Sequence, residues 1–239
     1  MNIPHITNFN IKDAPNLEKI VLAVHGFASS KKSPNTAAAS SELAKNNIGL
    51  LAFDLPSHGE NKTQLRIETC LDAIRQAENY LRQFNKPICF FSSSFGAYLT
   101  LLYLIDNPNQ YGEIILRSPA IDLHKTMLTI LRYCNVNLTD FERDKKATVL
   151  EKQVDYEFFL QSKQYNVFEN AHKIKETINI IYGTEDDVVD NNDIQKLGKV
   201  IPCNLYPIQG ADHDFKRLGD LNQMVAQICD ILFAKASKR

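Results

Sequence analysis

This chain has few glycines and few cysteines, a net charge close to zero and no long apolar run. The formal net charge is −1, so no global field draws the protein to nucleic acid or to an anionic membrane. No apolar run reaches the roughly 20 residues that span a bilayer, and residues 1–12 lack the basic and apolar regions of a signal peptide. We therefore expect a cytoplasmic protein with no nucleic-acid partner and no integral membrane segment. We leave open whether it forms a homo-oligomer.

The cysteines are odd in number and form no CxxC pair; they stand at positions 70, 89, 134, 203 and 229. This pattern argues against a disulfide framework and indicates reduced, mostly buried thiols in a cytosolic protein. It also provides no zinc-binding motif, so we expect no metal site.

Short apolar runs alternate with helical patterns, which is typical of a parallel sheet with crossover helices. The length of 239 residues suits one α/β domain with a buried core. The sequence predicts strands at residues 20–24, 49–53, 88–91, 113–116, 178–182 and 204–208. It predicts helices at residues 36–46, 65–84, 97–105, 192–199 and 214–234. A weakly alternating segment, residues 5–11, predicts an antiparallel edge strand.

A serine-rich turn, Ser-Ser-Ser-Phe-Gly at residues 92–96, joins an apolar run to a helical pattern. Such a turn lifts a hydroxyl clear of the sheet and places it at a helix N-terminus. Backbone N–H groups there can face a developing oxyanion. Ser92, Ser93 and Ser94 are all candidate nucleophiles, and the register with Gly96 favours Ser94.

A serine nucleophile needs a base, because an alcohol is a poor nucleophile at neutral pH. His213 stands in the loop 210–215, after a predicted strand, at the sheet edge where open α/β sheets bind ligands. The base in turn needs an acid that fixes its tautomer. Four acids follow the preceding predicted strand: Glu185, Asp186, Asp187 and Asp190. Residue type alone does not choose among them.

The few glycines are concentrated in the candidate loops. Five of the nine are Gly26, Gly59, Gly96, Gly183 and Gly210. Glycine is favoured where the backbone turns sharply or another group approaches closely, so this distribution supports a site built from these loops.

These loops together resemble the α/β-hydrolase superfamily over nearly the whole chain. The turn at 92–96 is similar to its nucleophile elbow G-x-S-x-G, with Ser92 in place of the first glycine. Residues 25–27, His-Gly-Phe, are similar to its oxyanion loop. Residues 54–60 are similar to its D-x-x-G-H-G loop, with Ser57 in place of a glycine. The closest likeness is to small carboxylesterases, cinnamoyl-type esterases and the monoacylglycerol lipase-like group.

The resemblance also implies the roles of individual residues. A glycine followed three positions later by an aspartate and then a valine is similar to the family's acid loop, which points to Asp186. The implied triad is Ser94, Asp186 and His213, in the chain order that this fold requires. The implied oxyanion donors are the backbone N–H groups of Phe27 and Phe95. His25 and His58 are implied to be structural.

The implied fold is a single α/β-hydrolase domain, 1–239, with a mostly parallel central sheet and helices on both faces. Residues 122–172, here called the inserted segment, interrupt the alternation and are implied to be a helical cap over the active site. We expect most of their aromatic side chains to pack the cap against the body, and changes at Phe158 or Phe159 to alter acyl-chain preference.

The expected function is hydrolysis of carboxylic esters with small to medium acyl chains through an acyl-enzyme, with no metal or organic cofactor. A lysophospholipase, a thioesterase and a serine aminopeptidase on the same triad remain open, as does a non-catalytic ligand-binding protein. An aminopeptidase needs an acidic pocket for the substrate amine. The acids available in the inserted segment are Glu142, Asp144, Glu151, Asp155 and Glu157, and their alternation with lysines favours a solvated face.

Overall fold

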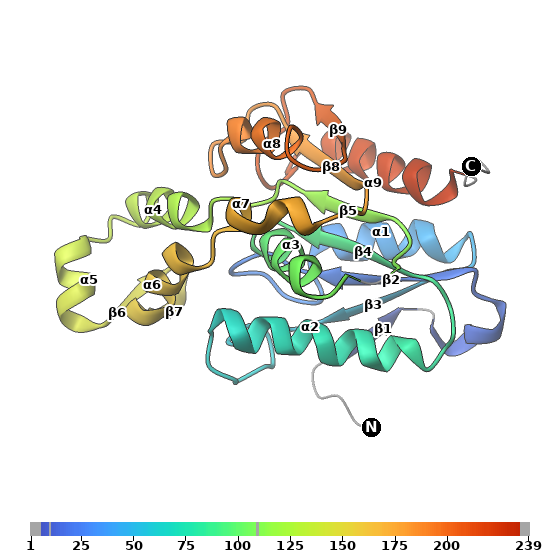
Figure 1. The fold of residues 1–239 in the computed structure, drawn as a ribbon, viewed down its shortest axis with the longest axis horizontal. Coiled ribbons are helices and arrows are strands. Elements are labelled where there is room, and N and C mark those ends of the chain that lie inside the picture. The colour runs from blue at the N-terminus through green and yellow to red at the C-terminus, as the bar shows by residue number, and fades with distance from the viewer. Residues whose placement is uncertain (1–5, 10, 109, 235–239) are drawn as a thin grey trace.

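The computed structural model describes residues 6–9, 11–108 and 110–234, and Figure 1 shows them as one sheet flanked by helices. The sheet has seven strands in the order β1-β3-β2-β4-β5-β8-β9. Their bounds are β1 Ile6–Phe9, β2 Lys19–Val24, β3 Ile48–Phe53, β4 Ile88–Ser93, β5 Ile114–Arg117, β8 Ile178–Gly183 and β9 Cys203–Ile208. Only β1 is antiparallel to its neighbour, which confirms the mostly parallel sheet and the edge strand. His5 and Asn10 of the expected edge strand lie outside the described residues.

Helices cover both faces of the sheet, as expected (Figure 1). On one face, α1 (Pro34–Ala44) packs beside α9 (Leu218–Phe233). On the other lie α2 (Ile67–Arg82), α3 (Phe95–Asp106) and α8 (Asn191–Leu197). Strand β2 illustrates why both faces need a cover of helices. Its side chains Ile20, Leu22 and Val24 join one buried cluster, whereas Val21 and Ala23 join the other. Such alternation buries both faces of a strand.

Local signals explain several helix boundaries. The Ser33 Oγ accepts the Thr36 N–H at 3.2 Å, so Ser33 caps α1 ahead of Pro34. Helix α3 is buried along its length, which fits its apolar composition on every side. Helix α9 begins at Leu218 rather than at the predicted residue 214. Phe215, at a φ of 56°, interrupts the helical path before it.

The inserted segment lies between β5 and β8 and extends beyond one end of the sheet (Figure 1). It contains the helices α4 (Leu123–Tyr133), α5 (Leu138–Asp144), α6 (Tyr156–Gln164) and α7 (Val167–Asn170). It also contains an antiparallel ribbon that the helical pattern did not predict, β6 (Lys146–Val149) paired with β7 (Lys152–Asp155). Leu150 and Glu151 both have positive φ at the turn of this ribbon, and residues of these types rarely adopt that conformation.

Two short 3₁₀ helices complete the structure, η1 (Ile11–Asn16) and η2 (Ala171–Lys173). Across the described ranges, no helix is long and apolar enough to cross a membrane. All five cysteines have free thiols; Cys70 and Cys89 are buried and the other three are half-buried.

The far edge of the sheet is β9, which contains Pro207. Ile178 N–H donates to the Pro202 carbonyl and Thr184 N–H donates to the Ile208 carbonyl. Even-numbered residues of β9 therefore turn their backbone polar groups toward β8. Because the direction alternates along a strand, residue 207 faces away from the sheet.

Candidate active site

Ser94 stands on the sharp turn between β4 and α3, with φ 50° and ψ −113°. The Ser94 N–H donates to the Arg117 carbonyl at 2.8 Å, and the Ala120 N–H donates to the Ser94 carbonyl at 3.2 Å. A side chain at Gly96 would collide with the carbonyl oxygens of Val24 and His25, so only glycine lets α3 approach β2 this closely. The turn therefore has the strained geometry that exposes a hydroxyl above a sheet.

The two other serines of this turn are held by different partners. The Ser92 hydroxyl is fully buried and lies 2.7 Å from the Thr100 Oγ1 in α3. Ser92 thus fits in place of a glycine without leaving an unsatisfied polar group. The Ser93 Oγ accepts a hydrogen bond from the Arg117 Nε at 3.2 Å. Of the three hydroxyls, only that of Ser94 contacts a histidine.

His213 joins Ser94 to Asp186. The His213 Nε2 lies 3.0 Å from the Ser94 Oγ, and the His213 Nδ1 lies 2.8 Å from the Asp186 Oδ2. An ionised carboxylate can only accept, so Nδ1 carries the proton and Nε2 is free to accept the Ser94 O–H. This is the tautomer in which a histidine can act as a base toward serine.

The Asp186 carboxylate has no solvent exposure and is held on both oxygens. Its Oδ1 accepts the N–H groups of Val188 and Val189, each at 3.0 Å. Burial alone would raise the pKa of Asp186, but the hydrogen bond from His213 and these two N–H groups lower the pKa below its ordinary value. Asp186 is therefore ionised at neutral pH and fixed in place.

The three rival acids point elsewhere. Glu185 is exposed. The Asp187 carboxylate accepts the Tyr133 hydroxyl at 3.2 Å. The Asp190 carboxylate caps α8 through the Asn192 N–H at 2.8 Å and pairs with Lys125. The structure thus separates candidates that residue type alone left equivalent.

The acid loop and the histidine loop pack directly on each other. A side chain at Gly183 would collide with the Ala211 carbonyl, so this glycine permits the contact. The Glu185 N–H donates to the same carbonyl at 3.0 Å, and the Gly210 N–H donates to the Thr184 Oγ1 at 2.8 Å. These hydrogen bonds fix the loop that carries Asp186 relative to the loop that carries His213.

Phe95 follows Ser94 in the chain, and the loop that carries Phe27 packs against Ser94. A Cβ built on Gly26 would lie 3.3 Å from the Ser94 Cβ, so the loop that carries Phe27 abuts the serine. Phe95 is the first residue of α3, where helix geometry leaves N–H groups without partners and the helix dipole is positive. The Phe27 and Phe95 rings meet edge to face with centroids 6.3 Å apart.

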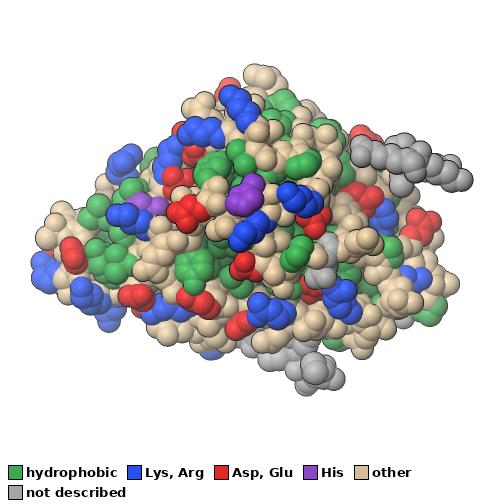
Figure 2. All heavy atoms as spheres, viewed as in Figure 1, with side chains coloured by type: hydrophobic (Ala, Val, Ile, Leu, Met, Phe, Trp, Pro, Cys, Tyr) green, Lys and Arg blue, Asp and Glu red, His purple; other side chains and the backbone are tan. Residues whose placement is uncertain are grey.

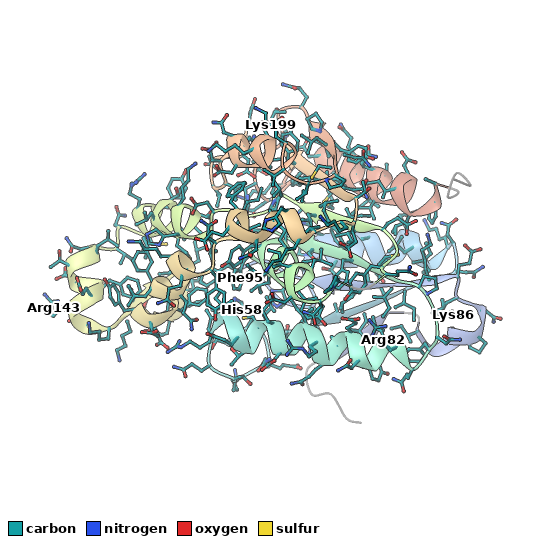
Figure 3. All side chains as sticks on the ribbon, viewed as in Figure 1. His58, Arg82, Lys86, Phe95, Arg143 and Lys199 are labelled. Atoms are coloured by element: carbon teal, nitrogen blue, oxygen red, sulfur yellow. The ribbon has the colours of Figure 1, made fainter. Side chains whose placement is uncertain are left out.

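His25 and His58 brace this loop through backbone contacts. The His25 Nε2 accepts the Leu55 N–H and the His58 Nε2 accepts the Ala28 N–H, both at 3.0 Å. Burial lowers the pKa of His25 to about 3 and also lowers the pKa of His58, so both stay neutral. Figure 3 shows His58 near Phe95, and the Phe27 ring contacts both.

Asp54 organises the neighbouring loop. Its buried carboxylate accepts the N–H groups of Lys31 at 2.9 Å and Glu60 at 3.0 Å, and the Lys31 Nζ lies 3.3 Å from it. Burial opposes ionisation, yet these donors lower the pKa of Asp54 below its ordinary value. Ser57, where the family has a glycine, adopts a φ of 60° and donates its hydroxyl to the Thr63 carbonyl.

Ser94 and His213 line a cavity of about 560 Å³. The inserted segment contributes Ile130, Tyr133 and Leu150 to its wall. Phe158 and Phe159, where changes are expected to alter acyl-chain preference, do not line this cavity. Both are buried; Phe158 packs edge to face on Phe95, while Phe159 packs among other aromatic side chains of the inserted segment. His58, implied to be structural, is not among the described residues that line the cavity.

Several residues of the cavity wall were not singled out from the sequence, among them Arg117 at the end of β5. It is 5% exposed. Its Nη1 donates to the His213 carbonyl, and its guanidinium carbon lies 5.4 Å from the centroid of the Phe215 ring. A lone charge that ends an apolar strand was the only signal in the sequence. No group of three His, Cys, Asp or Glu side chains in the described part of the chain is arranged to hold a metal ion.

A mostly parallel sheet with helices on both faces and a serine turn at the end of its central strand define the α/β-hydrolase class. A family model described as serine aminopeptidase, S33, matches residues 15–148, and the chain therefore belongs to this family of hydrolases. No curated protein matches the chain at a significant level.

Several solved structures share the fold at low sequence identity. Est1E from Butyrivibrio proteoclasticus, solved with ferulic acid, has a TM-score of 0.81 and 15% identity, covering 98% of this chain and 95% of that one. Mouse alpha/beta hydrolase domain-containing protein 10 has a TM-score of 0.77 and 13% identity, with coverages of 97% and 96%. The monoacylglycerol lipase of Paleococcus ferrophilus has a TM-score of 0.72 and 16% identity, with coverages of 97% and 98%. These likenesses support the fold along the whole chain.

Proposed function

We propose that the protein is a serine hydrolase that cleaves carboxylic esters with small to medium acyl chains. The observation that carries the proposal is the 3.0 Å contact between the Ser94 Oγ and the His213 Nε2 inside a cavity. The buried Asp186 behind His213 supports the imidazolium that would form when His213 takes the serine proton.

In the proposed reaction, Ser94 Oγ attacks the ester carbonyl while His213 Nε2 takes the hydroxyl proton. The N–H groups of Phe27 and Phe95 hold the oxyanion, and loss of one such donor typically lowers turnover about 10²–10³-fold. His213 then protonates the leaving alcohol. A water activated by His213 releases the acid and restores Ser94. None of these steps calls for a metal or an organic cofactor.

We also propose that the single domain 1–239 uses the inserted segment as a cap. Ile130, Tyr133 and Leu150 bring apolar surface to the cavity. A volume of about 560 Å³ lies within the range of sites that take small molecules. The apolar lining and the limited volume of the cavity together suit an acyl chain of limited length.

We favour an ester substrate over a peptide with a free N-terminal amine, because the acidic side chains of the inserted segment do not line the cavity. Glu142, Asp144, Glu151 and Glu157 are exposed, and Asp155 pairs with Arg66 at 2.7 Å. Among the described lining residues, the only carboxylate is that of Asp214, which pairs with Lys216 at 3.1 Å. An aminopeptidase needs a free carboxylate for the substrate amine.

Labelling with a fluorophosphonate followed by intact-mass measurement tests the proposal. The wild type is expected to gain one adduct that Ser94→Ala lacks, while Ser93→Ala keeps the adduct as the matched control. Loss of the adduct in Ser93→Ala alone would move the nucleophile to the neighbouring residue. A folded wild type without any adduct would favour a protein that binds ligands without hydrolysing them. A panel of esters, thioesters, lysophospholipids and aminoacyl amides then separates the activities that share this machinery.

A further inference from the structure

Arg117 is a buried cation in the wall of the catalytic cavity. Two bonds anchor it, from Nε to the Ser93 Oγ and from Nη1 to the His213 carbonyl. Its guanidinium also lies over the Phe215 ring. Ser93 precedes Ser94 and His213 is the base, so the charge is held beside both proposed reacting side chains.

The Arg117 charge has no carboxylate partner among the described residues. A guanidinium has five N–H donors, of which the two anchors use two. Nη2 has no hydrogen bond to any described residue. The buried unpartnered side-chain atoms of the described chain are Ser118 Oγ and Asn191 Oδ1, and Nη2 is not one of them. Nη2 therefore retains contact with solvent, and the cavity is where Arg117 meets it.

The nearby carboxylates are already engaged. Asp186 is bound to His213 and two backbone N–H groups. Asp214 pairs with Lys216. Asp212 accepts the Lys216 N–H at 3.2 Å. They act on Arg117 through space without forming an ion pair with it, so its guanidinium stands in the cavity wall without a carboxylate partner among the described residues. A buried charge without a partner is unfavourable unless a ligand supplies one.

We infer that Arg117 binds a carboxylate of the substrate, so that the preferred esters are those that carry a negative charge. The planar guanidinium suits a carboxylate because it can donate parallel hydrogen bonds to both oxygens. This inference rests on the proposed hydrolysis at Ser94. The carboxylate can belong to the acyl part or to the alcohol part of the ester, and matched substrates distinguish the two.

A purely structural role for Arg117 predicts a different result. If the residue only ties the His213 loop to β4, its loss lowers turnover equally on charged and neutral esters. If it binds the substrate, its loss lowers kcat/KM mainly for the charged ester. The discriminating quantity is thus the ratio of kcat/KM between a carboxylate ester and its neutral carboxamide analogue.

The experiment measures this ratio for two pairs of substrates. In one, the charge is in the alcohol part: 3-carboxyphenyl butanoate against 3-carbamoylphenyl butanoate. In the other, it is in the acyl part: the 4-nitrophenyl monoester of hexanedioic acid against that of its monoamide. The wild type is expected to favour the carboxylate at least about tenfold in one pair, as a charge-assisted hydrogen bond implies.

Variants assign the preference to Arg117. Arg117→Gln is expected to bring the ratio close to one, and Arg117→Lys is expected to retain part of it. Arg143→Gln removes the same charge at the far end of the inserted segment, where Figure 3 shows Arg143, and is expected to leave the ratio unchanged. An equal loss on both esters in Arg117→Gln would overturn the inference in favour of the structural role.

Other outcomes separate this inference from the proposed function. A wild type that labels with fluorophosphonate but shows no preference in either pair overturns the inference and leaves the hydrolase intact. A wild type that neither labels nor cleaves any ester overturns the proposed function. Calorimetric titration of Ser94→Ala with each substrate pair then measures the charge preference without turnover. The same titration decides the question in the event that Arg117→Gln does not fold. Equal affinity for both members of each pair would sink the inference.

Discussion

At the scale of single residues, Ser94 is held in a backbone conformation that non-glycine residues rarely adopt. Such strain costs of order 1–3 kcal/mol and persists only where the surroundings enforce it. Here the Arg117 carbonyl, the Ala120 N–H and the closely packed Gly96 enforce it. The same contacts present the hydroxyl to His213, so the strained turn and the hydrogen-bonded chain to Asp186 form one unit.

Asp186→Asn tests that unit. The amide preserves the shape of the side chain but removes the charge and can turn a donor toward His213, which favours the wrong tautomer. We expect kcat to fall by about 10⁴-fold, as in the triad proteases, with little change in Tm. Rates on 4-nitrophenyl acetate and a thermal melt measure both. Asp187→Asn, one position along and exposed, is the control; a comparable fall there would show that Asp186 is not the partner of the base.

Sequence reasoning was most specific where a residue belongs to a motif with fixed local geometry. Ser94 and His213 come from such motifs, and the structure brings them together. Asp186 could be selected only by resemblance, because four acids share its loop and only packing shows which one is buried. Arg117 could not be found, because its environment comes from Ser93, His213 and Phe215, which are remote in the sequence or belong to other elements.

At the scale of elements, all six predicted core strands are present within a few residues of their expected bounds. Buried parallel strands are continuous apolar runs, which are easy to recognise. The ribbon β6–β7 was not predicted because its turn uses Leu150 and Glu151 rather than glycine or asparagine. The late start of α9 was missed because hydrophobic periodicity does not reveal the positive φ of Phe215.

The ribbon β6–β7 brings Leu150 to the cavity, so the proposed role of the inserted segment in binding the acyl chain can be tested there. Leu150 is 47% exposed and lines the cavity. Leu150→Ala removes apolar surface that a longer acyl chain would cover, so we expect kcat/KM to fall by up to about tenfold on 4-nitrophenyl octanoate and little on the acetate. Leu160→Ala, 37% exposed on α6 and away from the cavity wall, is the control. An equal fall on both esters would mean damaged packing rather than a pocket for the acyl chain.

At the scale of the whole molecule, the two hydrophobic clusters on either side of the sheet provide the stability, and polar contacts fix the loops at its end. Figure 2 shows charges of both signs interspersed over one face, in keeping with the net charge of −1. Asp54, by contrast, carries a buried charge. Its carboxylate is bound to two N–H groups and to Lys31, in the loop that also supports His25 and His58.

Asp54 is expected to make stability depend on pH in the acid range. Its folded pKa lies below the ordinary value of 3.8, so its contribution to the free energy of unfolding is fully present above that pH. The contribution is lost as pH falls through the folded pKa. Urea unfolding between about pH 2 and 7 is therefore expected to show a gap between the wild type and Asp54→Asn that narrows below about pH 4. A gap that stays constant across this range would contradict the assignment, and Asp72→Asn, an exposed carboxylate, serves as the control.

Pro207 has a consequence for how copies of this protein can associate. It occupies an outward-facing position of the edge strand β9 and has no N–H to offer. A second chain aligned along β9 would meet a gap in the row of donors, which natural sheets use to resist edge-to-edge growth. Strand addition at this edge is thereby disfavoured, so a pair of molecules is directed away from joining β9 to β9 in one continuous sheet.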